Sequence, residues 1–268
     1  MSRINLVLLI VAGLLVLGFT SFYLPRKDNQ IPTQKVSKNE TKDIPRLETI
    51  AQNLEVPWAL VFLPIRQAQG GPDASLLFTE RIGRVRFIDS KSNLSPTPIA
   101  VIEDVLHEGE GGLMGIAIHP DFSKNHFVYL HYTYANNSGQ TLNRVVRFQF
   151  ENNTLSDKTK IVDKIPGALF HNGGRIKFGP DGFLYITTGD SQNPSLSQDK
   201  NSLAGKILRV TEDGKPAPGN PFNNEVFSYG HRNPQGIAWD ENGRLWATEH
   251  GQSAQDELNI INIGKNYG

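Results

Sequence analysis

The sequence predicts an all-β domain made of repeated sheets, preceded by an apolar N-terminal segment and a polar linker. Three observations predict this fold class. From Arg46 onward, short apolar runs alternate with glycine-containing turns, and few segments show the 3.6-residue periodicity of a helix. The chain contains 25 glycines and 16 prolines, enough for many tight turns. The same strand–turn–strand pattern also recurs along the chain.

Three hairpins show this pattern most clearly. Each consists of two β-rich runs separated by a turn that contains glycine. The paired runs are Leu76–Glu80 with Arg84–Ile88, Arg175–Phe178 with Phe183–Thr188, and Ile237–Trp239 with Arg244–Thr248. The segments Phe127–Tyr134 and Arg144–Phe150 are also expected to be strands, because they are rich in aromatic and β-branched residues and contain no breaker.

The repeated unit is about sixty residues long. Equivalent positions in its first strand are Leu60, Ile116, Ile176 and Ile237, which lie 56, 60 and 61 residues apart. A unit of this length made of short antiparallel strands is typical of a β-propeller blade. The chain holds roughly four such units, and the stretch 66–75 is a loop insertion in the first. Since blades bury their faces only against neighbouring blades, we expect residues 46–268 to form an incomplete larger propeller.

The N-terminus carries a targeting signal. Ile4–Leu24 is almost wholly apolar, follows the positive charge of Arg3, and is just long enough to cross a bilayer. Because Phe22–Leu24 are bulky and no small-x-small cleavage site follows, residues 1–24 are expected to be an uncleaved signal anchor. A cleaved signal peptide is the alternative. Both place the rest of the chain outside the cytoplasm, after a flexible polar stalk over 25–45.

Charge balance, the absence of cysteine and the absence of one motif argue against several classes of function. Lysine plus arginine balance aspartate plus glutamate, 27 against 27, which gives no electrostatic reason to expect nucleic acid as a partner. There are no cysteines, so disulfides, thiolate metal sites and cysteine nucleophiles are excluded. No Gly-x-Ser-x-Gly elbow is present, so a serine hydrolase of that type has no support.

Five glycine-rich motifs follow one another in the repeats. They are 109–122 (GEGGLMGIAIHPDF), 171–182 (HNGGRIKFGPDG), 203–209 (LAGKILR), 230–236 (GHRNPQG), and 248–268 with its TEHG, DELN and NYG groups. In this order the motifs resemble those of the soluble aldose (glucose/sorbosone) dehydrogenases that depend on pyrroloquinoline quinone (PQQ). The resemblance covers almost all of the chain after the stalk.

The resemblance implies a six-bladed propeller that holds PQQ with a calcium ion over its central pocket. It implies oxidation of an aldose at C1 to the lactone, with a hydride passing to PQQ, a histidine as general base, and an external electron acceptor. This division of roles agrees with general chemistry. Histidine can take a proton near neutral pH, and a hard cation can polarise a quinone carbonyl. Arginine pairs with carboxylates such as those of PQQ.

The family's roles can be carried over to individual residues. His171 matches the general base, and Arg232 and Asn233 match the pair that contacts the cofactor. Glu110 lies where the family presents a polar side chain to the quinone. Gly251 and Gln252 match the positions whose backbone carbonyls hold calcium.

Each assignment has an alternative. His171 also fits a turn before a Gly-Gly bend, Arg232 and Asn233 fit a loop shaped by proline and glycine, and Glu110 fits a solvated loop acid. Asp256 and Glu257 fit either a second calcium site or solvated acids. The remaining histidines do not have metal-ligand spacing.

Two departures from the family pattern affect the functional prediction. Phe170 precedes His171 where some relatives have a polar residue, and the residues that the family's last blades contribute to the PQQ site have no counterpart. One alternative function is therefore a degenerate propeller that binds a glycan or a protein outside the cytoplasm. Another is a calcium-dependent lactone hydrolase on the same fold, which fits the Arg-Asn pair less well.

Overall fold

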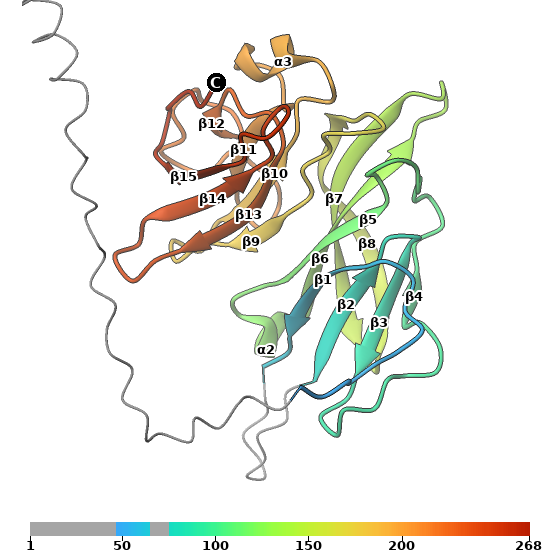
Figure 1. Cartoon of the computed structure of the whole chain (residues 1–268). Coiled ribbons are helices and arrows are strands. Elements are labelled where there is room, and N and C mark those ends of the chain that lie inside the picture. Colours follow the sequence, from blue (N-terminus) through green and yellow to red (C-terminus); the bar gives the residue numbers. More distant parts are fainter. Residues whose placement is uncertain (1–46, 65–74) are drawn as a thin grey trace, which may run out of the picture. The chain divides into compact units, whose positions relative to one another are not determined.

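The computed structural model describes residues 47–64 and 75–268, which form four antiparallel sheets in chain order (Figure 1). The first sheet contains β1 (Pro57–Phe62), β2 (Leu76–Glu80), β3 (Arg84–Ile88) and β4 (Ala100–Val101). The second contains β5 (Leu113–Ile118), β6 (Phe127–Ala135), β7 (Thr141–Glu151) and β8 (Thr154–Pro166). The third contains β9 (Ile176–Phe178), β10 (Leu184–Thr188), β11 (Lys206–Val210) and β12 (Val226–Tyr229). The fourth contains β13 (Pro234–Trp239), β14 (Leu245–Glu249) and β15 (Glu257–Ile261).

Each sheet is a meander, because neighbouring strands follow one another in sequence. This is the arrangement of propeller blades, so the predicted all-β propeller fold is confirmed. The described part of the chain also contains two short helices, α2 (Phe122–Asn125) and α3 (Pro194–Gln198).

The predicted repeat is visible in the strand pairing. Leu60, Ile116, Ile176 and Ile237 all lie on the first strand of their blade, where they pair with the second strand. Three of the four pairings shift register just before this residue, between Pro57 and Leu60, Leu113 and Ile116, and Pro234 and Ile237. A bulge at the start of a strand re-aims the preceding loop, and two of these three loops, before β5 and β13, carry motifs.

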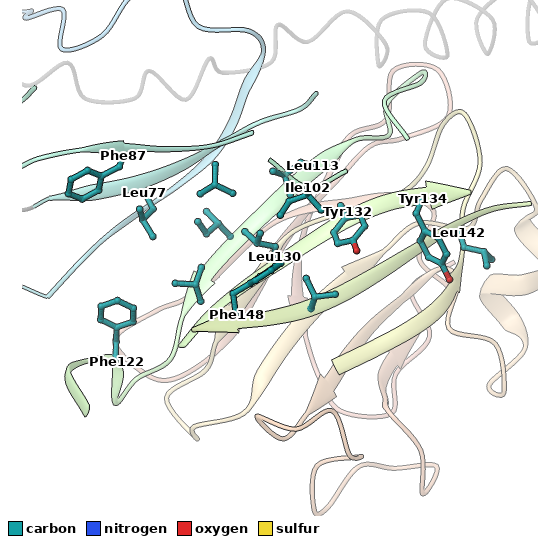
Figure 2. Close-up of a cluster of buried hydrophobic side chains, with 14 residues drawn as sticks. Leu77, Phe87, Ile102, Leu113, Phe122, Leu130, Tyr132, Tyr134, Leu142 and Phe148 are labelled. Atoms are coloured by element: carbon teal, nitrogen blue, oxygen red, sulfur yellow. The ribbon is translucent and has the colours of Figure 1, made fainter. Parts of the chain in front are cut away.

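Apolar clusters pack consecutive blades together. The first cluster joins the first two blades and includes Leu77, Phe87, Leu113 and Leu130 (Figure 2). The second joins the second and third blades, and the third joins the third and fourth. Burying one such side chain contributes about 1.5–3 kcal/mol, so packing between blades holds the domain together.

The two end blades expose apolar side chains. Leu60 and Phe62 on β1 are each 59% exposed, and Leu258 and Ile260 on β15 are 65% and 36% exposed. Each pair is two residues apart and therefore lies on one face of its strand.

The predicted signal anchor (1–24) and stalk (25–45) lie outside the described residues, as does most of the predicted insertion at 66–75. Among the residues that are described, no helix is both long enough and apolar enough to cross a bilayer.

Candidate active site

The candidate site is built from the loops that precede the first strands of three blades. Glu110 lies before β5, His171 before β9, and Arg232 and Asn233 directly before β13. Hydrogen bonds between these loops bring the four residues together, as the following contacts show.

His171 is held through one ring nitrogen. Its Nδ1 lies 2.8 Å from Oδ1 of Asp190, whose side chain is 3% exposed, and that oxygen also accepts the N–H of Gln192 at 2.8 Å. An ionised Asp190 accepts Nδ1–H, which leaves the lone pair of the neutral imidazole on Nε2. Nε2 has no hydrogen-bond partner among the described residues, and the side chain is 18% exposed. The ring is therefore arranged to accept a proton at Nε2.

The backbone around His171 is tightly constrained. His171 has a φ of 62°, in the left-handed region that side chains rarely adopt. The strand β10 ends at Thr188, and a Cβ atom on the following residue, Gly189, would lie only 2.0 Å from the carbonyl oxygen of His171. The buried Asn172 closes the same loop, because its amide bonds the N–H of Ala168 at 3.1 Å and the carbonyl of Ala168 at 2.8 Å.

Glu110 links the three loops. Its Oε2 accepts the backbone N–H of His171 at 2.9 Å and lies 3.4 Å from Nδ2 of Asn233. Asn233 is 1% exposed, and its Oδ1 accepts the N–H of Gly173 at 3.0 Å. The structure thus gives Glu110 a structural contact with the backbone of the candidate base.

Arg232 projects a largely unpaired guanidinium. Its Nη1 donates to the carbonyl of His250 at 3.1 Å, and its other side-chain N–H groups have no partner within 47–64 and 75–268. A partly exposed guanidinium with open donors fits a carboxylate ligand.

The predicted calcium positions lie directly after His250, which contacts Arg232. The N–H of Gly251 donates to Oδ1 of Asp256 at 3.0 Å, and Gln252 is exposed. The carbonyls of Gly251 and Gln252 accept no hydrogen bond from the described residues, so both oxygens are available to a cation. Neither residue directly contacts His171 or Glu110 through a hydrogen bond.

Side chains alone do not form a metal centre in the part of the chain that is described. No three His, Cys, Asp or Glu residues there are grouped to hold an ion. Asp256 bonds the Gly251 backbone, and Glu257 accepts Nδ2 of Asn259 at 2.8 Å.

Two site residues were missed by sequence reasoning. Asp190 orients the candidate base, and Glu249 accepts hydrogen bonds from the turn that carries Arg232 and Asn233. A signal for Glu249 was present, because Thr248-Glu249 repeats Thr79-Glu80 at the end of a second strand. No spacing rule singled out Asp190.

Comparisons with known proteins show which sequences and solved structures this chain is similar to. A solved PQQ-bound aldose sugar dehydrogenase from Streptomyces coelicolor is 44% identical, with a TM-score of 0.74, over 83% of this chain and 64% of that one. The aldose sugar dehydrogenase YliI of Escherichia coli is 33% identical over 83% of this chain and 61% of its own length. Quinoprotein glucose dehydrogenase B of Acinetobacter calcoaceticus is 32% identical over 82% and 51%.

A more distant similarity points to a different class of protein. Human Hedgehog-interacting protein is 25% identical over 84% of this chain and 36% of its own length. The chain therefore spans between about a third and two thirds of the proteins named here.

One family model matches residues 54–268, which include every motif and site residue described above. That model is described as Glucose / Sorbosone dehydrogenase. The chain therefore belongs to the glucose/sorbosone dehydrogenase family.

Proposed function

We propose that this chain carries the catalytic histidine and part of the cofactor site of a PQQ- and calcium-dependent aldose dehydrogenase that oxidises its sugar at C1 to the lactone. The observation that supports this most strongly is the His171–Asp190 pair, with Nδ1 occupied and Nε2 open, beside Glu110 and Asn233. An external electron acceptor completes the proposed reaction.

The residues present fit the two groups that the proposal requires. Arg232 has open donors for the carboxylates of PQQ, and Asn233 lies beside it, directly before β13. The carbonyls of Gly251 and Gln252, which accept no hydrogen bond from the described residues, fit calcium, which prefers oxygen ligands. When bound, PQQ supplies the hydride acceptor and calcium polarises its quinone.

The protein's own contribution is proton transfer and positioning. In the proposal, His171 Nε2 takes the proton of the anomeric hydroxyl, and Asp190 stabilises the imidazolium that results. The carboxylate of Glu110 accepts the backbone N–H of His171 and lies beside Asn233. This contact holds the base in a fixed position relative to Arg232 and Asn233.

The test follows PQQ binding by fluorescence and dye reduction with a panel of aldoses, with PQQ and calcium added to this chain and to any longer form of it. We expect His171→Ala to abolish dye reduction while PQQ still binds. His126→Ala is the matched control, because His126 also has a positive φ, of 52°, but follows the helix α2 rather than a site loop. Absence of PQQ binding in every form would contradict the proposal.

Calcium is tested separately. Removing it with a chelator should weaken PQQ binding, and adding calcium back should restore it. If binding is unchanged after chelation, the carbonyls of Gly251 and Gln252 do not hold a required ion.

A binding module is the second candidate function. It is supported by the similarity to Hedgehog-interacting protein and by two apolar side chains beside His171, Leu169 and Phe170, which are 52% and 45% exposed. This candidate predicts binding on a glycan or protein array that a Leu169→Ser, Phe170→Ser double variant loses, without any binding of PQQ. Retained PQQ binding and aldose oxidation favour the enzyme instead.

We also propose that residues 1–24 export the domain and keep it attached to the membrane, so that it works outside the cytoplasm. A reporter enzyme that is active only outside the cytoplasm, fused after residue 46, should be active and should stay with membranes after carbonate washing. Release of the reporter with a new N-terminus near residue 25 would instead show a cleaved signal peptide.

A further inference from the structure

A single buried carboxylate holds the turn that carries Arg232 and Asn233. Glu249, the last residue of β14, is 5% exposed. Its Oε1 accepts the backbone N–H of Asn233 at 3.0 Å and that of Arg232, and its Oε2 lies 2.9 Å from Nδ1 of His231. Three consecutive residues are therefore bonded to one side chain.

The turn held by Glu249 contacts the loop of the candidate base and the residue that orients it. Oδ1 of Asn233 accepts the N–H of Gly173, two residues after His171, at 3.0 Å. The carbonyl of Arg232 accepts the N–H of Asp190 at 2.8 Å. A displacement of this turn would therefore move the two cofactor-contacting residues of the proposal and disturb Asp190, which orients His171.

The first blade contains an equivalent carboxylate, Glu80, in a place where there are no candidate site residues. Glu80 ends β2 and pairs with Pro57, as Glu249 ends β14 and pairs with Pro234. Oε1 of Glu80 accepts the N–H of Glu55, two residues before its proline, at 2.8 Å, just as Glu249 accepts that of Arg232.

The two carboxylates differ in what balances their charge. Glu80 lies 3.2 Å from Nη1 of Arg86 and 3.8 Å from Nη1 of Arg84. Among the described residues, Glu249 has no lysine or arginine side chain within salt-bridge distance and is bonded to backbone N–H groups and to His231, which in turn bonds Ser228 at 2.8 Å. The carboxylate of Glu249 therefore makes its hydrogen bonds to the residues of the turn.

We propose that Glu249 is a positioning residue for the cofactor site, which fixes the backbone of Arg232 and Asn233 and, through them, the loops of His171 and Asp190. The link to PQQ rests on the proposed function, whereas the contact between Glu249 and the turn rests on the hydrogen bonds described above. The role is geometric, so glutamine should be able to replace glutamate. Its amide oxygen can accept both backbone N–H groups, while its NH₂ donates to His231, which changes tautomer and donates to Ser228.

The first measurement needs no cofactor. Hydrogen exchange of the Arg232 and Asn233 amides is followed in the full chain and in Glu249→Gln, Glu249→Asp and Glu249→Ala. Both amides should be protected in the wild type and in the glutamine variant. They should exchange faster by at least about tenfold in the aspartate variant, which is one methylene shorter, and in the alanine variant. The Glu55 amide should be unaffected in all three.

The second measurement is PQQ affinity. Loss of a side chain that orients ligand-binding residues typically weakens binding by about 10- to 100-fold, which is the loss expected for the aspartate and alanine variants. Glu249→Gln should stay close to the wild type. The matched control, Glu80→Ala, should lower the melting temperature and expose the Glu55 amide while leaving PQQ affinity unchanged.

The outcomes separate this inference from the proposed function. Unchanged protection of the two amides in Glu249→Asp and Glu249→Ala overturns the positioning role, whatever the cofactor does. Lost protection with unchanged PQQ affinity overturns the link to the cofactor. If no form of the protein binds PQQ, the proposed function and this link fall together, while the amides still decide whether Glu249 holds the turn.

Discussion

At the scale of single residues, the contact between His171 and Asp190 determines which ring nitrogen is open. Changing Asp190 to asparagine keeps the shape but removes the charge that holds Nδ1–H and stabilises the imidazolium. We expect the aldose oxidation rate to fall by at least about tenfold while PQQ affinity stays near the wild-type value. Steady-state rates and a PQQ titration on the same preparation check this, and an unchanged rate would show that Asp190 does not orient the base.

His131 is a buried histidine outside the proposed chemistry. It lies on β6, is fully buried, and neither ring nitrogen has a hydrogen-bond partner among the residues that the structure describes. Burial lowers the pKa of His131 from 6.5 to about 4, and the nearby Gly174 backbone opposes this shift only in part, without forming a hydrogen bond.

This lowered pKa predicts acid sensitivity. Between pH 6.5 and 4 the unfolded chain binds a proton at this histidine while the folded chain does not, so the free energy of unfolding falls as the pH falls. The loss reaches about 3 kcal/mol. Urea denaturation at several pH values should show this slope in the wild type and a shallower one in His131→Leu. Equal slopes in the two proteins would place the acid sensitivity elsewhere.

The sequence singled out candidate chemistry-bearing residues but not the residues that position them. His171, Arg232 and Asn233 lie in short, local glycine-rich motifs, and their roles in the chemistry stay predictions. Asp190 lies 19 residues from His171, and its role exists only because β10 ends against the His171 loop. Such pairings depend on tertiary contacts between loops, which single-sequence patterns do not contain.

At the scale of elements, the sequence predicted the hairpins with clear turns well but did not predict β8, a strand that is largely polar. Leu76–Glu80 and Arg84–Ile88 are β2 and β3 with the predicted bounds. By contrast β8 extends over 13 residues, yet most of Thr154–Lys160 is exposed and lacks apolar alternation. It is a strand because it pairs with β7 along its length, so cross-strand hydrogen bonds outweigh local propensity there.

The short helix α3 is fixed by a lysine from the neighbouring strand. Nζ of Lys206, which is 0% exposed, donates to the carbonyls of Leu196, Ser197 and Ala204 at 2.8, 2.9 and 2.7 Å. Burial lowers the pKa of Lys206 to about 8. The ammonium is the hydrogen-bond donor to the carbonyls of Leu196 and Ala204 in the described part of the chain, whereas the carbonyl of Ser197 also accepts the N–H of Gly230 at 2.9 Å.

Replacing Lys206 with methionine keeps the length of the side chain but removes all three donors. We expect the free energy of unfolding to drop by about 2–4 kcal/mol, because buried carbonyls lose their partners. Urea denaturation measures the loss, and Lys124→Met, at an exposed lysine of α2, is the control. A change as small as that of the control would mean that the carbonyls find other partners.

At the scale of the whole molecule, the exposed apolar side chains of the two end blades predict that this chain self-associates in solution. Leu60 and Phe62 on β1 and Leu258 on β15 are each more than half exposed, and large exposed apolar faces promote association. The triple variant Leu60→Ser, Phe62→Ser, Leu258→Ser should self-associate less than this chain at equal concentration. Light scattering and sedimentation check this, and unchanged association would mean that the contacts are made elsewhere.

The backbone at His171 also implies a trade-off between stability and activity. A left-handed conformation costs a residue with a side chain about 1 kcal/mol relative to glycine, and His171 adopts it with a φ of 62°. His171→Ala and His171→Gly both remove the contact with Asp190, so the difference between them isolates the backbone term. Under the proposed function, the glycine variant should melt at a higher temperature than the alanine variant, while neither oxidises aldoses. That difference measures the stability that the domain gives up to keep an imidazole where the backbone favours glycine.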